Sequence, residues 1–207
     1  MMRISYHAGS RLRLICSIIH YSCSPASAQT YLNQQFSATR PNEIWASDVT
    51  YFRYKENERY ICVIIDLYAC MVVGFRIGLK NSTQLVKSTF KLAYEQRQPQ
   101  LPLLFHTDRG SNYRSNAFCS YLQSLGVTQS FSRTHVPYDN SVMESFFASM
   151  KREELYRTKY RSEQELRAAV AEYIKFYNES RPHAKNGYKT PDKKEQEYYA
   201  KSKQNEK

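Results

Sequence analysis

Three acidic residues, Asp48, Asp108 and Glu144, stand in sequence contexts that an arbitrary acidic residue would lack. Asp48 interrupts a strand-like run, Asp108 ends an apolar run just before a glycine-containing turn, and Glu144 lies near the start of an amphipathic helical pattern. Thirty-five residues separate Asp108 from Glu144, and Lys151 follows seven residues after Glu144. Carboxylates delivered by two strands and a helix can hold two divalent metal ions about 3.5–4 Å apart for in-line phosphoryl transfer. The set therefore predicts chemistry on nucleic-acid phosphodiesters.

Asp48 has two interpretations that the sequence leaves open. Aspartate is depleted in strands, so a solvated outward position in an edge strand would explain it. In a strand, however, Asp48 shares one face with Ala46, Thr50 and Phe52, which is a mixed face rather than a plainly solvated one. Burial of Asp48 beside a metal ion is the second interpretation.

Asp108 follows the apolar run 103–107, at the end of a strand where α/β sheets place their sites. The turn 110–112 begins with glycine, which lets the backbone approach a phosphate closely. His106 would share a strand face with Asp108, so it could support a metal ligand from behind. The simpler alternative is that His106 is a packed core residue.

Glu144 also has a structural alternative. Ser141 and Glu144 match a capping box, in which the glutamate would only bond the Ser141 amide. Asp139 and Asn140 are equally good caps and would leave Glu144 free. On a helix, Lys151 lies about 20° from Glu144, two turns along the same edge. That edge either is a solvated charged surface or carries a metal ligand, Glu144, and a phosphate-binding lysine, Lys151.

The elements expected to position these residues form an α/β domain with a mixed sheet. We expect strands at residues 43–54, 59–68, 71–77, 103–107 and 127–131, and helices at residues 84–96, 115–125, 140–156 and 163–177. The first three strands are spaced as a meander, with Gly74 as a bulge or a point of close approach. Gly126 is expected to end the second helix, and residues 132–139 form a loop. The lysine-rich tail after Pro191 is expected to be frayed or partly helical.

Charge and composition favour a soluble protein with a polyanionic partner. The net charge is +11, and residues 145–207 carry 15 basic and 10 acidic side chains. Such basic flanks suit nucleic acid, because neutralised phosphates release counterions. No apolar run approaches the length of a membrane span, and Leu14–Ile19 is short for the core of a secretory signal. Five cysteines form no paired motif, so a reducing, cytoplasmic (nucleoid-associated) location is expected.

Four ordered segments resemble the integrase core of DDE transposases from bacterial insertion sequences, of the kind encoded in a second, frameshifted reading frame. They are Arg40–Phe52, His106–Tyr113, Asp139–Phe147 with Lys151, and Tyr173–His183 with Gly187–Pro191. Their order and the 35-residue gap make the resemblance specific, and it covers about residues 29–195.

The resemblance implies a retroviral-integrase-like catalytic core: an RNase H-like mixed sheet flanked by helices, with a C-terminal helical extension. It also implies two Mg²⁺ or Mn²⁺ ions, with Asp48 bridging them and Asp108 and Glu144 completing one site each. Water, and then a DNA 3′-OH, would attack phosphodiesters, giving end cleavage and strand transfer in a homo-oligomeric synaptic complex with double-stranded element ends and target DNA. The implied DNA contacts are Lys151, Arg152, Asn112 and Arg109.

The resemblance divides the chain into an irregular segment (1–40), a catalytic core (41–160) and a basic helical extension (161–207). Relatives of this kind carry a helix-turn-helix region upstream, and residues 1–28 do not match one. One alternative is therefore a truncated or aberrant reading frame whose product is a non-transposing DNA-binding remnant or an inhibitor of a full-length transposase. Another is a stand-alone RNase H-like nuclease.

Overall fold

The computed structural model describes residues 38–132 and 140–205, and all statements below concern these residues. Their centre is a five-stranded mixed sheet in the order β3-β2-β1-β4-β5. The strands are β1 (Ile44–Tyr54), β2 (Asn57–Asp66), β3 (Met71–Gly78), β4 (Leu104–Thr107) and β5 (Thr128–Phe131). The first three pair antiparallel, whereas β1, β4 and β5 run parallel. The predicted meander and mixed sheet are confirmed.

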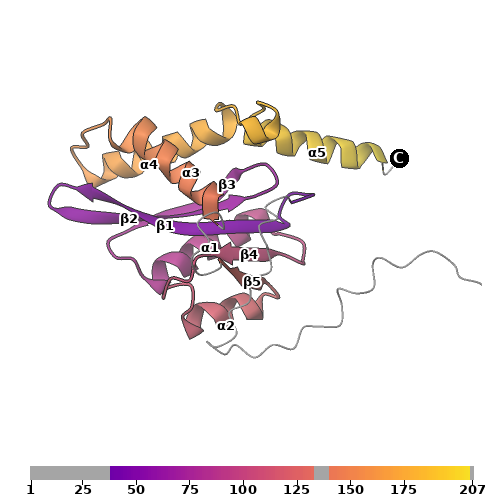
Figure 1. Ribbon diagram of the computed structural model, residues 1–207, viewed down its shortest axis with the longest axis horizontal. Helices are drawn as coiled ribbons and strands as arrows, with labels where there is room; N and C mark the ends of the chain where they lie inside the picture. The colour runs from indigo at the N-terminus through magenta and orange to yellow at the C-terminus, as the bar shows by residue number, and fades with distance from the viewer. Residues whose placement is uncertain (1–37, 133–139, 206–207) are drawn as a thin grey trace, which may run out of the picture.

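Helices cover both faces of the sheet (Figure 1). They are α1 (Thr83–Arg97), α2 (Asn116–Ser124), α3 (Ser141–Met150), α4 (Glu163–Glu179) and α5 (Pro191–Asn205). One turn of π-helix, Lys151–Leu155, follows α3 and is called the π turn below. In Figure 1, α3 and α4 lie on one side of the sheet and α1 and α2 on the other, which gives three layers. None of the described helices is long and apolar enough to cross a membrane.

The interior strand β2 explains why two helical layers are needed. Its run Ile61–Ile65 is fully buried, with alternate side chains entering opposite cores, as expected for a strand covered on both faces. Ile61, Val63 and Ile65 pack in the core that contains α3 and α4. Cys62 and Ile64 pack in the core that contains α1 and α2. Helix α4 therefore shares one hydrophobic core with the sheet and with α3.

Several boundaries differ from the prediction. The second strand runs over Asn57–Asp66 rather than 59–68, because residues 67–70 turn into β3. The helix expected at 140–156 ends as an α-helix at Met150 and continues as the π turn. The tail after Pro191 is a continuous helix, α5, through Asn205. The predicted loop at 132–139 and the irregular segment 1–40 lie almost wholly outside the described residues.

Both predicted glycine roles have a physical basis in the structure. Gly126 has a φ of 70°, the left-handed conformation expected just after a helix. Gly74 is a point of close approach, because an added Cβ would lie 2.8 Å from Cβ of Ala93 on α1. The β-bulge lies next to Gly74 on the same strand, because Ile64 and Ile65 of β2 pair with Gly74 and Val72 and leave Val73 as the extra residue.

Gly74→Ala is expected to lower the free energy of unfolding by about 1–3 kcal/mol, since the new methyl group would push α1 away from the sheet. Urea unfolding of the two proteins measures this difference. Gly187→Ala is a useful comparison, because no atom lies within 4 Å of the added Cβ and only its φ of 64° opposes the change. An unchanged midpoint for Gly74→Ala would show that α1 can move without cost.

Side chains of α4 form hydrogen bonds with the backbone at the outer edge of β3. The Asn178 amide on α4 donates to the carbonyl of Val72 and accepts from its N–H, both at 2.9 Å. Arg167, also on α4, donates to the carbonyl of Ile77 at 3.1 Å. The side-chain amide of Asn178 thus makes the pair of hydrogen bonds that a neighbouring strand would make.

Helix α5 is held to the sheet by a partly buried charge network. Arg97 at the end of α1 contacts a carboxylate oxygen of Glu195 at 2.7 Å and lies 3.9 Å from Asp66. Asp66 is fully buried and accepts hydrogen bonds from the backbone N–H groups of Asn42 at 2.6 Å and Tyr68 at 2.9 Å. Burial is the main cause that raises the pKa of Asp66 to about 6. The network ties α5 to the start of β1 and to the turn after β2.

Candidate active site

Pairing within the sheet places Asp48 and Asp108 beside each other. The parallel pairing of β1 with β4 ends at Ser47 opposite Thr107, and each acid is the next residue along its strand. β1 is flanked by β2 and β4, so the edge-strand interpretation of Asp48 is wrong. The side chain of Asp48 is half-buried on the sheet face that α3 and α4 cover. Asp108 therefore follows the carboxyl end of β4, the position at which α/β sheets bind ligands, and Asp48 lies beside it within β1, where the parallel pairing stops.

Glu144 reaches this region from α3. Met143, Phe146 and Met150 are buried in the same core as Ala46 of β1, which orients the helix and leaves Glu144 exposed on its other side. The N-cap of α3 is Asn140, so Ser141 is the first helical residue. A capping box would need Ser141 at the N-cap, so that interpretation of Glu144 is wrong.

The electrostatics of Asp48 show that the acids lie within range of one another. The pKa of Asp48 is raised to about 7, mainly because burial disfavours the charged form. The negative charges of Asp108 and Glu144 raise it further, whereas the N–H of Val49 and the charge of Lys151 lower it. The four charged side chains that sequence analysis selected thus form one electrostatic group.

The carboxylates do not form a tight cluster. Across residues 38–132 and 140–205, no group of three His, Cys, Asp or Glu side chains is close enough to hold a metal ion. Asp48 accepts a hydrogen bond from the N–H of Val49 at 2.7 Å, and Asp108 accepts one from Gly110 at 3.0 Å. Mutual repulsion of like charges accounts for this spread, and a cation between the carboxylates would offset it. The donor set is all oxygen, which fits Mg²⁺ or Mn²⁺.

Gly110 has a specific role beside Asp108. An added Cβ at Gly110 would lie 3.0 Å from Oδ1 of Asp108 and 3.4 Å from its Oδ2. Any other residue would therefore crowd the Asp108 carboxylate, which would have to shift by a few tenths of an ångström.

His106 is a packed core residue. Its side chain is fully buried, and its ring nitrogens lie 3.1 Å from the Ser130 hydroxyl and 3.2 Å from the Ser132 hydroxyl. The hydroxyl groups come from β5 and the residue after it, so His106 joins the two parallel strands. The structure favours this role over that of a support for a metal ligand.

The predicted DNA contacts lie in two places. Lys151 opens the π turn with its Nζ 5.4 Å from the centre of the Tyr51 ring, and Arg152 is largely exposed. Arg109 and Asn112 lie on the loop after β4. Arg109 donates to the Ser132 carbonyl at 2.9 Å, and the Asn112 amide bonds the side chain of Asn81. Lys151 is the one that the electrostatics link to Asp48.

The sequence analysis missed a buried polar cluster beneath Asp48. The hydroxyl of Ser47 donates to the Val63 carbonyl at 2.9 Å and lies 2.9 Å from the Tyr113 hydroxyl. Ser47 and Cys62 are fully buried, and Tyr113 nearly so. Tyr113 closes the segment His106–Tyr113, and that position was the signal that could have identified it. The cluster fixes the strand that presents Asp48.

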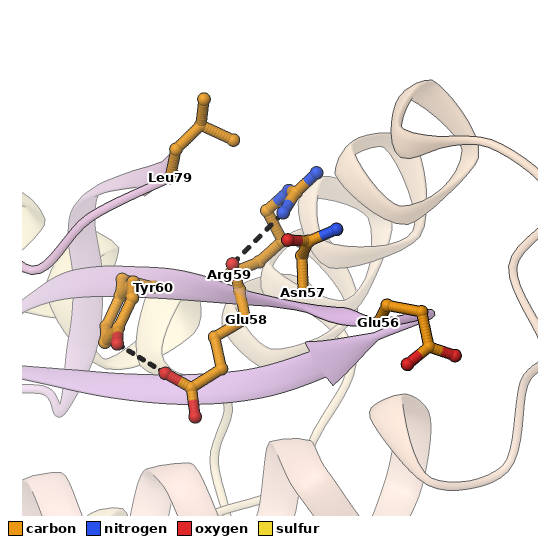
Figure 2. Close-up of a pocket in the computed structure, with 6 residues that line it drawn as sticks. All are labelled: Glu56, Asn57, Glu58, Arg59, Tyr60 and Leu79. Carbon is orange, nitrogen blue, oxygen red and sulfur yellow. Dashed lines mark hydrogen bonds between the residues drawn. The ribbon is translucent and has the colours of Figure 1, made fainter.

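A surface hollow lies elsewhere, at the hairpin between β1 and β2 (Figure 2). It is lined by Glu56, Asn57, Glu58, Arg59, Tyr60 and Leu79. The hydroxyl of Tyr60 donates to a carboxylate oxygen of Glu58 at 2.5 Å. None of the predicted site residues lines this hollow.

Comparisons with known proteins agree with the architecture. Residues 38–137 and 125–191 match two models of the integrase core domain. The chain is 36% identical over 189 residues to the transposase for insertion sequence element IS904 of Lactococcus lactis, covering 90% of this chain and 73% of that protein. It is 34% identical over 166 residues to the transposase InsF for insertion sequence IS3A of Escherichia coli, covering 80% of this chain and 58% of that protein.

Solved structures show the same fold. The catalytic core domain of HTLV-2 integrase, in a complex with magnesium, matches with a TM-score of 0.61 and 21% identity over 75% of this chain and 97% of that one. The catalytic core domain of BIV integrase matches with a TM-score of 0.59 and 18% identity over 78% of this chain and 98% of that one. The expected RNase H-like fold is thereby confirmed.

The chain spans less than two thirds of several relatives, including 61% of the 31 kDa protein of insertion element IS600 from Shigella sonnei. The identity to the IS904 transposase nevertheless extends over most of both chains. On this evidence, the chain belongs to the family of insertion-sequence transposases that carry an integrase core domain.

Proposed function

We propose that the protein is a metal-dependent polynucleotidyl transferase that cuts the DNA ends of an insertion sequence and joins them to target DNA. The observation that carries this is the placement of Asp48 and Asp108 at the point where the parallel pairing of β1 with β4 stops, with Glu144 and Lys151 in electrostatic range. Family membership supports the same reaction class.

Within this proposal, Asp48, Asp108 and Glu144 hold two Mg²⁺ or Mn²⁺ ions. Bound there, such ions activate the attacking oxygen and stabilise charge on the leaving oxygen of a phosphodiester. The attacking oxygen belongs first to water and then to a DNA 3′-OH, so no protein nucleophile is needed. The half-buried position of Asp48 limits competition from water for its carboxylate.

The DNA backbone is held by cationic and amide side chains around the acids. Lys151 is placed to meet a phosphate beside Glu144, with Arg152, Arg109 and Asn112 extending the contact. Double-stranded element ends and target DNA are the proposed partners, held by several copies of the chain. The division into a core at 41–160 and an extension at 161–207 stays a prediction, although α4 contributes to the core of the sheet.

The test uses purified protein, Mg²⁺, Mn²⁺ or EDTA, and labelled duplexes that carry the terminal repeats flanking its reading frame. Nicking at the repeat ends and joining to a second duplex, both abolished by EDTA, is the expected result. Cleavage without joining would favour a stand-alone nuclease. Binding to the repeats without cleavage in either metal would favour the alternative of a DNA-binding remnant or inhibitor. This alternative is tested because the chain covers less than two thirds of the length of several relatives.

Lys151→Gln is expected to weaken DNA binding for all sequences alike and to reduce the slope of log K against log salt by about 1, since one phosphate contact is lost. Fluorescence anisotropy across a salt series measures both quantities. Lys91→Gln is the matched control, because Lys91 lies on α1 under the opposite face and its side chain is 60% exposed. Equal effects from the two variants would mean that Lys151 contributes only to the general positive field.

A further inference from the structure

The chain leaves α-helical geometry at the edge of the candidate site. The π turn Lys151–Leu155 is closed by the N–H of Tyr156, which donates to the carbonyl of Lys151 at 2.9 Å. Single π turns are uncommon and occur frequently at functional sites. This one begins at Lys151, two helical turns after Glu144. Its geometry therefore affects how the end of α3 and the basic side chains are presented.

Arg181, which follows α4, bonds both sides of this junction. Its Nε and Nη2 donate to the two carboxylate oxygens of Glu153 at 3.1 and 2.9 Å. Its Nη2 also lies 3.4 Å from the hydroxyl of Ser149. Ser149 is in the last turn of α3 and Glu153 is in the π turn, so one guanidinium spans Lys151. Paired donors on one carboxylate fix direction as well as distance.

Neighbouring aromatic side chains hold Arg181 in this position. The Tyr173 hydroxyl donates to Glu153 at 3.0 Å, and the Arg181 guanidinium lies 5.8 Å from the centre of the Tyr177 ring. Tyr177 in turn packs edge-on against Phe146, with ring centres 4.8 Å apart. Hydrogen bonds from Arg181, followed by Tyr173, lower the pKa of Glu153, so its carboxylate stays ionised. Helix α4 and Arg181, the residue after its C-cap, thus contact α3 on both its buried and its exposed sides.

We propose that Arg181 is a positioning residue for the acidic site: through Glu153 and Ser149 it sets the orientation of the helix that presents Glu144 and Lys151. The inference rests on the proposed function of that site. Glu153 binds the Nε and Nη2 of Arg181, whose side chain is 26% exposed, whereas that of Arg152 is 72% exposed, so Arg152 is the better placed of the two to reach a phosphate. Without Arg181, the π turn loses the contact that fixes it relative to α4.

Arg181→Met keeps much of the aliphatic stem and removes the guanidinium. We expect kcat for metal-dependent cleavage to fall about 10- to 100-fold, as for other groups that orient a ligand from behind. The KM for DNA and the salt dependence of binding should stay within about 2-fold, because no phosphate contact is lost. Arg181→Lys keeps the charge and one donor and should restore part of kcat.

Arg167→Met is the matched control. Arg167 lies on α4, bonds Glu163 at 2.6 and 3.0 Å through two nitrogens, and no bond joins it to α3. The Arg167→Met substitution should leave kcat near the wild-type value. Hydrogen exchange gives a readout independent of activity: amides of residues 147–156 should exchange faster in Arg181→Met and unchanged in Arg167→Met. If Arg181→Met does not fold, Glu153→Gln, which keeps an acceptor but loses the charge, should lower kcat by about 3- to 10-fold.

Wild-type kcat in a folded Arg181→Met or Glu153→Gln protein would overturn the positioning role while leaving the proposed function intact. A loss confined to KM and the salt slope would also overturn it, in favour of a direct DNA contact by Arg181. Wild-type protein that cleaves no DNA with either metal would overturn the proposed function. In that case, unchanged exchange of residues 147–156 in Arg181→Met would overturn the structural part of the inference as well.

Discussion

Asp48→Asn, Asp108→Asn and Glu144→Gln are each expected to lower metal-dependent DNA cleavage at least about 10³-fold, equivalent to about 4 kcal/mol of lost transition-state stabilisation. Each change keeps the size of the side chain and removes an anionic ligand. The three losses should not add, because residues that act as one unit fail together. Cleavage and joining should fall in parallel, since one set of carboxylates serves both steps.

Two further substitutions of the same chemical kind separate this effect from a general loss of charge. Asp192→Asn on α5 and Glu172→Gln on the exposed side of α4 should retain wild-type rates. Urea unfolding of every variant confirms that it folds. A folded Asp48→Asn protein that cleaves at the wild-type rate would remove Asp48 from the site, and the same logic applies to the other two acids.

Asp48→Asn is also expected to stabilise the metal-free protein at pH 8 by about 1–3 kcal/mol. The pKa of Asp48 is about 7 in the folded protein against an ordinary value of 3.8, mainly through burial. The folded state therefore binds more protons than the unfolded state between about pH 4 and 7, so stability falls as pH rises through this window. A shift of three pKa units limits the gain in the free energy of unfolding to about 4 kcal/mol. The partial exposure of Asp48 to solvent reduces this gain.

The measurement is urea unfolding in EDTA at pH 5 and pH 8. The quantity to compare is the difference in the free energy of unfolding between variant and wild type at each pH. This difference is needed because Asp66, with a pKa of about 6, also titrates in this range. The difference in the free energy of unfolding should be about 40% of its full value at pH 5 and reach its full value at pH 8. Added Mg²⁺ at pH 8 should then stabilise wild type more than the variant, since binding favours the folded state by mass action. Equal stability of the two proteins at pH 8 would contradict the burial of a charged Asp48.

Local sequence patterns were sufficient to predict the sheet and the choice of acids. Alternation and length identified β1 to β5, and the turn chemistry of Gly126 marked the end of α2. The position of Asp108 after a short apolar strand predicted its place at the rim of the sheet, and the comparisons confirmed the family. Whether these acids bind metal stays a prediction.

Long-range side-chain partners could not be predicted in the same way. The π turn after α3 contains Glu153, whose bonding partners Tyr173 and Arg181 lie 20 and 28 positions away, so no local sequence pattern predicts these bonds. The capping box at Ser141 matched its motif, yet the N-cap is Asn140 and α3 begins at Ser141, so the match is accidental. Likewise, the hydroxyl groups that bond His106 come from a strand 24 residues later.

The bonds that Asn178 makes to Val72 have a consequence for assembly. An open strand edge is a template on which another chain can add its own strand, and such addition leads to sheets that continue without limit. On β3 the amide of Asn178 already occupies that position, and the opposite edge strand, β5, is only four residues long. Copies that gather around DNA are therefore expected to meet through helices and loops, in a closed complex of defined size rather than an open-ended fibre.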